Sequence, residues 1–236
     1  MPNKRGDKLM KNDIKKYILK SNGIAVYALI IIIILIIIAI AGIIIVLRIV
    51  SSNDVESKMA EIDELTKKAC NTTNFSVILK NNGEYSGKVI YKDGIFMQEI
   101  YNAEYNSTFW SDTRSIEENN VIYSDENRFY VKNTLNITWN PEKFTILNVL
   151  KTYEYSGEKE YDGIECYLVS TPLDEVEKYG YKTTAYIDKN TGFVIRIETE
   201  NNGLTNVSER EFSVGTVTDH DVAYPDLTGY TDRTVY

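Results

Sequence analysis

Residues 74–101, NFSVILKNNGEYSGKVIYKDGIFMQEIY, set the character of the fold. Apolar and polar side chains alternate along this stretch, which is the period of a β-strand with one buried face. Two turn signals interrupt it, Asn81-Asn82-Gly83 and Lys92-Asp93-Gly94, because asparagine, aspartate and glycine accept the positive φ angles of tight hairpins. The stretch therefore predicts three consecutive antiparallel strands.

The same pattern continues after this meander. Short strands are predicted at residues 108–111, 121–123 and 128–132, and longer ones at 153–158, 164–170, 181–188, 193–200 and 204–212. Helical spacing is confined to an amphipathic segment at 53–69, a proline-initiated helix near 140–150 and a short turn at 174–179. A sheet of roughly ten antiparallel strands with two or so helices makes the predicted fold class α+β.

A second stretch, residues 24–47, contains no charged residue. At a rise of about 1.5 Å per residue, a helix of this length reaches roughly 36 Å, enough to cross the ~30 Å hydrocarbon core of a bilayer. The alternative is a cleavable signal peptide, whose apolar region is shorter and ends in small residues. Here Arg48, Ile49 and Val50 follow instead. The sequence thus predicts a single N-terminal transmembrane helix that is retained as an anchor.

The charges on either side of this segment predict its orientation. Residues 1–23 hold seven lysine or arginine residues and two aspartates, whereas residues 51–236 hold 18 basic and 32 acidic residues, a formal charge of −14. Because an excess of positive charge marks the cytoplasmic side, we expect a single-pass protein of the cell membrane with its C-terminal domain extracytoplasmic. The negative charge of that domain argues against a nucleic-acid partner.

The chain is accordingly divided into four segments. These are a basic cytoplasmic tail at 1–23, a transmembrane helix at 24–47, a juxtamembrane amphipathic helix at 48–73 and an extracytoplasmic antiparallel β-rich domain at 74–230. Helical spacing places five apolar residues on one side of the amphipathic helix: Val55, Met59, Ile62, Leu65 and Ala69. We expect this narrow stripe to pack on its own domain, and docking on a partner helix is the alternative.

Two cysteines, Cys70 and Cys166, lie in the part predicted to be extracytoplasmic, where disulfides form. A bridge between them would close a loop of roughly 100 residues and contribute up to about 4.7 kcal/mol in the chain-entropy model. Two separate buried thiols are the alternative, because sequence spacing does not fix the distance between the two side chains. The sequence leaves both interpretations open.

Sequence motifs for catalysis are absent. His220, the single histidine, lies between Asp219 and Asp221, but alternate residues of a strand point to opposite faces and no second histidine or thiolate cluster lies nearby. No glycine-rich phosphate loop and no serine or cysteine nucleophile motif is present. We therefore expect no enzyme activity, no metal and no cofactor, with glycosidase-type chemistry on a chance pair of carboxylates as the alternative.

Apolar residues at alternate positions of several strands would share one inward face. This set comprises Phe75, Val77, Leu79, Val89, Tyr91, Phe193, Ile195 and Ile197. An ordinary core beneath the helices is one interpretation. Because two helices cannot fill a sheet of about ten strands, the sharper prediction is that these residues line an apolar cup for a ligand.

Three short motifs resemble the bacterial lipoprotein-carrier (LolA-like) superfamily: YDGIECYLV at 161–169, AYIDKNTGFVIR at 185–196 and VAYPDL at 222–227. Members commonly have a strand of the form G-x-x-C/A-hydrophobic, a hairpin of the form hydrophobic-D-x-x-T-G-x-hydrophobic and, in some relatives, the ending V-x-x-P-D-L. The resemblance covers about residues 53–228. It implies a curved half-barrel sheet whose concave apolar face holds acyl chains beneath helices.

These patterns together predict a membrane-tethered extracytoplasmic protein that binds a lipid or lipidated polypeptide in an apolar cup and catalyses no reaction. The expected partners are the membrane and an acyl-lipid or lipoprotein ligand. The alternative is a structural or signalling partner in a cell-envelope complex with no small ligand, bound through the helix at 53–69 and the sheet surface. In that case Ile62→Asp should disrupt assembly and leave the β domain folded.

Overall fold

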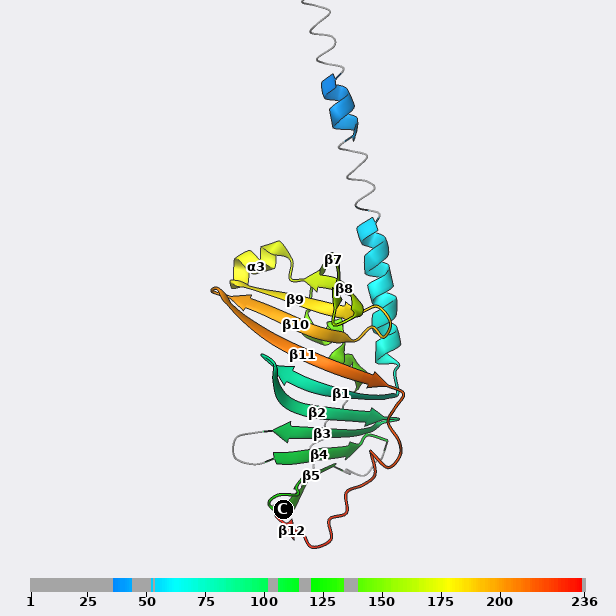
Figure 1. Cartoon of the computed structure of the whole chain (residues 1–236), viewed down its shortest axis with the longest axis vertical. Helices are drawn as coiled ribbons and strands as arrows, with labels where there is room; N and C mark the ends of the chain where they lie inside the picture. The colour runs from blue at the N-terminus through cyan, green and yellow to red at the C-terminus, as the bar shows by residue number, and fades with distance from the viewer. Residues whose placement is uncertain are drawn as a thin grey trace, which may run out of the picture. The chain divides into compact units, whose positions relative to one another are not determined.

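A computed structural model describes residues 36–43, 52, 54–101, 106–114, 120–133 and 140–234 of the chain. The chain divides into two compact units, Met1–Glu56 and Ser57–Tyr236. The boundary falls inside the segment 48–73 that the sequence predicts as one amphipathic helix. In the first unit, residues 36–43 form a helix with exposed side chains. The second unit contains the sheet on which the candidate site is built (Figure 1).

Twelve strands form one sheet in the order β12-β6-β5-β4-β3-β2-β1-β11-β10-β9-β8-β7. Two meanders, β1–β6 and β7–β11, are thus joined side by side by the pairing of β1 with β11. Neighbouring strands are antiparallel except β12 and β6, which run parallel. The bounds are β1 Asn74–Asn81, β2 Glu84–Lys92, β3 Ile95–Tyr101, β4 Asn106–Asp112, β5 Asn120–Ser124, β6 Phe129–Asn133, β7 Glu154–Tyr161, β8 Ile164–Ser170, β9 Tyr181–Asp188, β10 Val194–Asn201, β11 Leu204–Val214 and β12 Thr231–Asp232.

Both hairpin turns predicted in the first meander are present. Asn82 and Gly83 have φ angles of 51° and 83° and join β1 to β2, and Asp93 and Gly94, at 46° and 91°, join β2 to β3. Two successive residues with positive φ match the right-handed twist of the flanking strands. The turn residues therefore fix the register of the three strands that the sequence predicted.

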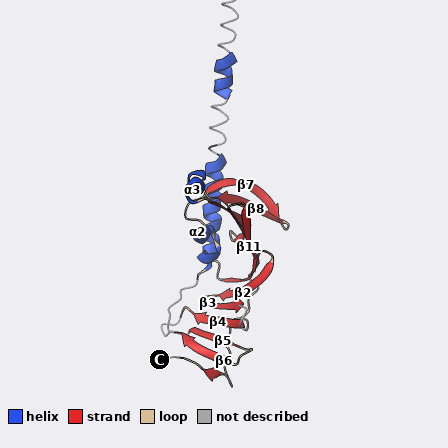
Figure 2. Ribbon diagram, turned by 90° about the vertical axis from the view of Figure 1, so that its left-hand side faces the viewer, coloured by secondary structure: helices blue, strands red, loops and turns tan. Residues whose placement is uncertain are grey.

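The helices of the second unit lie on one side of strands β7–β11 (Figure 2). The longest described helix covers residues 54–70, and η1 (Pro141–Phe144), α2 (Ile146–Val149) and α3 (Leu173–Tyr179) are short. Ile62 and Ala69 of the long helix are fully buried, and Ile62 packs in a cluster with residues of β8, β9 and β10. Four of the five stripe residues, Met59, Ile62, Leu65 and Ala69, therefore pack on the domain of the sheet, as expected, whereas Val55 is exposed.

The fold class predicted from the sequence is wrong. That prediction combined an N-terminal transmembrane helix with a half-barrel of roughly ten antiparallel strands and two or so helices. The structure is instead a twelve-stranded sheet with one parallel pair, and within the described residues no helix has both the length and the apolar character needed to cross a membrane. The tail at 1–23 and most of 24–47 lie outside those residues. The sequence does not indicate β12, because two residues are too few to show a period.

Candidate functional site

Most of the predicted cup residues pack together in a filled core. Six of the eight belong to one buried cluster: Phe75, Val77, Leu79, Val89, Tyr91 and Phe193. Side chains from the helix, from neighbouring strands and from η1 fill the space between them: Ala69, Phe96, Phe109 and Phe144. The rings of Phe193 and Phe212 stack with centroids 4.5 Å apart. In the structure these residues therefore form the ordinary core that was the alternative to an open cup.

The other two predicted residues lie elsewhere. Ile197 packs against the cluster that contains Ile62, on the helix-covered face. Ile195 lies in a β-bulge of β10, where the register with β9 shifts between Val194 and Arg196. It is buried on the opposite face, in a cluster with Cys166 and Tyr186. A bulge adds one residue to a strand and changes the face to which a side chain points, so strict alternation misplaced Ile195.

On the face that bears Ile195, the end of β7 reaches across to β11, although three strands separate them in the sheet. The Tyr161 hydroxyl donates a hydrogen bond to Glu209, and Nη1 of Arg196 donates to the Tyr161 hydroxyl at 3.0 Å and to Oε1 of Glu209 at 2.6 Å. Nε of Arg196 donates to Glu198 at 2.7 Å. This network holds the β7–β8 hairpin against β11.

The hydrogen bond from Tyr161 also sets its protonation state. The Glu209 carboxylate, which accepts that bond, raises the pKa of the Tyr161 hydroxyl, and burial acts in the same direction. The hydroxyl therefore stays a neutral donor up to a higher pH than a free tyrosine. The contact between β7 and β11 is accordingly maintained across the neutral range.

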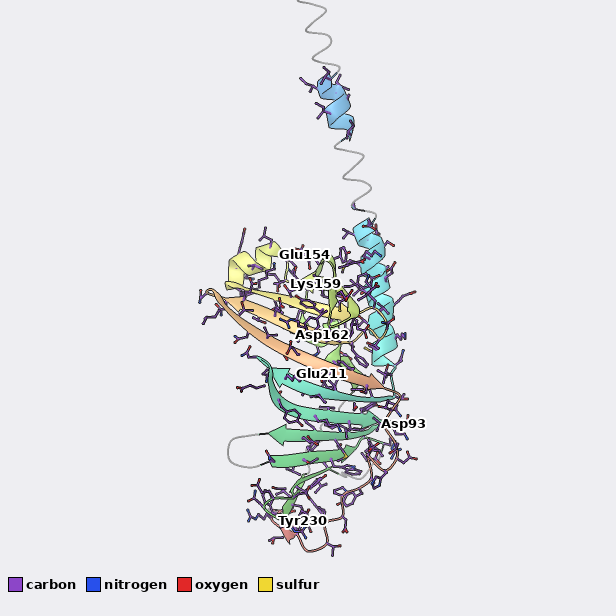
Figure 3. All side chains as sticks on the ribbon, viewed as in Figure 1. Asp93, Glu154, Lys159, Asp162, Glu211 and Tyr230 are labelled. Atoms are coloured by element: carbon purple, nitrogen blue, oxygen red, sulfur yellow. The ribbon has the colours of Figure 1, made fainter. Side chains whose placement is uncertain are left out.

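A pocket of about 320 Å³ lies where the hairpin meets β11. Four apolar side chains contribute to its lining, Ile164, Ile195, Phe212 and Val214, and the remaining lining residues are Lys80, Tyr161, Asp162, Asp188, Thr191, Glu209, Arg210 and Glu211. In the view of Figure 3, Asp162, in the turn after β7, lies between Lys159 of β7 and Glu211 of β11. Apolar walls with a few polar groups are typical of small-ligand sites, and the volume is at the lower end of their usual range of about 300–1,000 Å³.

Arg210 is the residue of this site whose surroundings are least usual. Its Nη1 atom is buried and has no hydrogen-bond partner within the part of the chain that the structure describes. Its Cζ atom lies 5.6 Å from the centre of the Phe144 ring. Burial lowers the pKa of the guanidinium to about 10, because removal from water disfavours the charged form. The side chain still carries its positive charge at neutral pH.

The two cysteines are separate free thiols in the structure, so the disulfide that the sequence allowed is not formed. Cys166 is buried with Tyr186 and Ile195, and burial raises its pKa to about 11. Cys70 is half-buried near the end of the helix at 54–70. The two side chains therefore belong to different surroundings rather than to one site.

The acidic residues around His220 have other partners. Asp219 forms an ion pair with Lys92 at 2.7 Å, and Asp221 accepts hydrogen bonds from the backbone nitrogen and hydroxyl of Thr218. No group of three or more histidine, cysteine or acidic side chains that could hold a metal ion occurs among the described residues. The sequence 219–221 is thus part of a surface turn.

No protein-family model matches the chain, and no curated protein matches its sequence. Among solved structures it is similar to a chain of the MucA/MucB complex of Pseudomonas aeruginosa, with 14% identity and a TM-score of 0.36, over 70% of this chain and 60% of that one. It is also similar to LprF from Mycobacterium bovis (9% identity, TM-score 0.34, 69% and 95% covered). A third is a putative outer membrane lipoprotein-sorting protein domain from Vibrio parahaemolyticus. It has 12% identity and a TM-score of 0.24, over 69% of this chain and 94% of that one.

These similarities are distant and assign the chain to no family. The part matched in the MucA/MucB complex is about 60% of that chain's length. The neighbours also include a lipoprotein from Mycobacterium tuberculosis, LppX, at 14% identity and a TM-score of 0.28. Attachment to a membrane is not part of this likeness.

The polar residues of the site were not predicted from the sequence. Tyr161 and Arg196 lie in the motifs quoted for the superfamily resemblance, but no role was predicted for them. The stretch Glu209-Arg210-Glu211-Phe212 contains the signal that could have revealed Arg210. In a strand that alternates with period two, Arg210 shares a face with the aromatic Phe212, whereas Glu209 and Glu211 lie on the other face. A cation on the apolar side of a strand is an unusual arrangement that needs a reason.

Proposed function

We propose that this chain is a non-catalytic binding protein that takes the apolar part of a lipid or lipidated polypeptide into the pocket between the β7–β8 hairpin and β11. The observation on which the proposal rests is the 320 Å³ pocket itself, with Ile164, Ile195, Phe212 and Val214 among its lining residues. Of the predicted cup residues, only Ile195 lines it. Phe193 supports the site from behind, because Phe212 packs against both Phe193 and Ile195.

The proposed place of action is the extracytoplasmic face of the cell membrane. Support for this part comes from the sequence, in the uncharged segment 24–47 and the basic residues 1–23 that precede it. The acidic domain would then be held close to lipid without adhering to anionic head groups. Protease added to intact cells that produce the full chain with a C-terminal tag should remove the tag. Protection of the tag until the cells are lysed would refute this location.

The test of ligand binding uses the full chain purified from membranes. Native mass spectrometry, followed by organic extraction, should reveal an acyl species that co-purifies with the protein. The variant Val214→Trp should reduce the amount at least fivefold, because Val214 lies at the pocket, is 45% exposed and can accept a larger side chain without unfolding the core.

Leu204→Trp is the matched control for this substitution. Leu204 is 73% exposed at the first position of β11, next to the turn from β10, and it does not line the pocket. This variant should retain the acyl species at the wild-type level. Equal retention by the two variants, or a wild-type protein that carries no acyl species and takes none up, would contradict the proposed function.

A second candidate function is docking of a protein partner in an envelope complex. It is favoured by exposed apolar side chains around α3: Leu147, Leu173, Tyr179 and Tyr181, which are 41–68% exposed. Leu147, Tyr179 and Tyr181 line a groove of about 540 Å³. Ile62→Asp does not test this hypothesis, because Ile62 is fully buried and a buried carboxylate would unfold the domain. Leu173→Asp tests it, and unchanged co-purification of envelope proteins would argue against it.

A further inference from the structure

The sheet has two outer edges, and the residues of β7 protect one of them. β7 bears four charged side chains, all of them exposed: Glu154, Glu158, Lys159 and Glu160. Its register with β8 also shifts between Tyr155 and Gly157. Exposed charges and a β-bulge both hinder the pairing of an edge strand with a strand of another molecule. The β7 edge is therefore protected by its own sequence.

β6, near the other edge, lacks this protection. It begins with Phe129, Tyr130 and Val131, and Lys132 is its single charged residue. Its register with β5 is uninterrupted over the five paired residues. Aromatic and β-branched residues favour strand pairing, and an open edge of this kind is a template for another strand. The sequence of β6 therefore requires that something else cover its outer side.

That cover is a segment at the C-terminal end of the described chain, residues 229–234, which we call the edge cap. It contains β12, the last strand of the sheet (Figure 1). The backbone nitrogen of Thr231 donates to the carbonyl oxygen of Arg128, and that of Arg233 donates to the carbonyl oxygen of Tyr130, both at 2.9 Å. The edge cap thus uses the outward backbone groups that another strand would need.

Much of the edge cap lies at the protein surface. The backbone nitrogen of Lys132 donates to Oγ1 of Thr234 at 2.9 Å, in an exposed position. Cζ of Arg128 lies 4.2 Å from the centre of the Tyr230 ring. Both residues of β12 are exposed. Segments held by exposed backbone hydrogen bonds open at a lower free energy than the core of a domain, so the edge cap is the part of the sheet that is most easily released.

A second β6 strand is a suitable replacement for the edge cap. Two copies of β6 related by a two-fold axis at Val131 run antiparallel, and positions 130 and 132 then exchange backbone hydrogen bonds. These are the positions whose outward groups bond to the edge cap. Lys132 would lie opposite the aromatic Tyr130 of the other copy, and no like charges would face one another within 129–133.

We propose that the edge cap blocks a strand-pairing surface on β6, and that a second copy of this chain pairs with that surface when the edge cap is released. The inference goes beyond the proposed function and does not depend on it, because the ligand pocket lies between the β7–β8 hairpin and β11. It assigns to residues 229–234 the control of self-association.

The test releases the edge cap by substitutions in the full chain. Proline has no backbone N–H, so Thr231→Pro combined with Arg233→Pro removes both backbone donors to β6. Sedimentation equilibrium in density-matched detergent should then give twice the mass of the wild-type protein. Thr231→Ala combined with Arg233→Ala is the matched control. It retains both N–H groups, and its mass should equal that of the wild type.

A further substitution tests whether β6 forms the interface. The N–H of Lys132 points to the edge cap and not to β5, and proline is tolerated where the N–H of a strand faces outward. Added to the two proline substitutions, Lys132→Pro should return the mass to the wild-type value. Lys132→Thr, which keeps the N–H, should leave the mass doubled. Equal masses for these two proteins would overturn the inference.

Hydrogen exchange separates a released edge cap from a damaged fold. In dilute samples of the double proline variant, the Lys132 amide should exchange faster than in the wild type, and the Phe109 amide in β4 should stay as slow. Fast exchange at Lys132 without a gain in mass would show that the open edge does not self-associate. Unchanged exchange at Lys132 would show that these backbone bonds do not hold the edge cap. Fast exchange at Phe109 would attribute any doubled mass to unfolding. Each of these three results would overturn the inference.

Discussion

The two faces of strands β8, β9 and β10 differ sharply. On one face Tyr167 and Ile187 pack under the helix at 57–70 together with Ile62, in an apolar cluster. On the other face Tyr186 and Ile195 lie beside hydrogen-bonded ion pairs and a pocket. Successive residues of the same strands enter these two environments. The helix that packs on one face therefore contributes to the apolar cluster there, and the other face is more polar.

The largest expected change in stability comes from a substitution on the helix-covered face of the sheet. Phe75 is 1% exposed and contacts the rings of Phe144 and Phe193. Phe75→Ala should lower the free energy of unfolding by about 3–5 kcal/mol, since it removes a buried ring and leaves a cavity. Urea denaturation of the full chain in a mild detergent, followed by circular dichroism, measures this loss.

Leu204→Ala provides the comparison for that experiment. Leu204 is 73% exposed at the start of β11, so its truncation should change stability by no more than about 0.5 kcal/mol. A loss below about 1 kcal/mol for Phe75→Ala would mean that the core around it is loosely packed. An open cup would then again describe this face better than a filled core.

A second prediction concerns the packing of the helix at 57–70 against the turn that precedes β10. Gly192 and Gly203 have almost equal φ angles, 79° and 78°, but a Cβ atom at Gly192 would lie 2.1 Å from the carbonyl oxygen of Leu65, whereas one at Gly203 would meet open space. Gly203→Ala should cost about 1–2 kcal/mol, the strain of a left-handed backbone. Gly192→Ala should cost about 1–3 kcal/mol more, because the helix must move.

Because the backbone strain is the same in the two variants, the difference between their stabilities reports the helix contact alone. Hydrogen exchange of amides in residues 57–70 should also become faster in Gly192→Ala and stay unchanged in Gly203→Ala. Identical losses in the two variants would show that the turn after β9 does not support the helix.

On the opposite face of the sheet, we expect the free energy of unfolding to depend on charged hydrogen bonds rather than on buried apolar volume. Arg196 is buried to about four-fifths and bonds to Glu198, Glu209 and Tyr161. Arg196→Met should lower the free energy of unfolding by about 1.5–3 kcal/mol, the range for hydrogen bonds to charged groups. Lys80→Met, which breaks a pair with the more exposed Glu211, should cost clearly less, because water screens an exposed ion pair. Equal losses in thermal unfolding would mean that the Arg196 network does not hold β7 against β11.

What the sequence could predict follows from the range of the interactions involved. The first meander and the longer strands were predictable, because alternation and the turn residues Asn82, Gly83, Asp93 and Gly94 act within a few neighbouring positions. The site was not, because it depends on a bulge at Ile195 and on the approach of β7 to β11, which no local pattern encodes. The choice between a disulfide and two free thiols stayed open for the same reason, since the chain spacing of two thiols does not determine their separation in space.

The smallest effect expected is a difference in reactivity between the two thiols, and it leaves the fold intact. Burial raises the pKa of Cys166 to about 11, and it also raises that of the half-buried Cys70. At pH 8 only about one Cys166 side chain in a thousand is the reactive thiolate, and the sheet covers it. Iodoacetamide at pH 8, analysed by peptide mass spectrometry, should therefore label Cys70 first and Cys166 only when urea is added. Rapid labelling of Cys166 in the native protein would show that the pocket side of β8 opens easily, and the contrast between the two faces would then lie in their polarity and not in their packing.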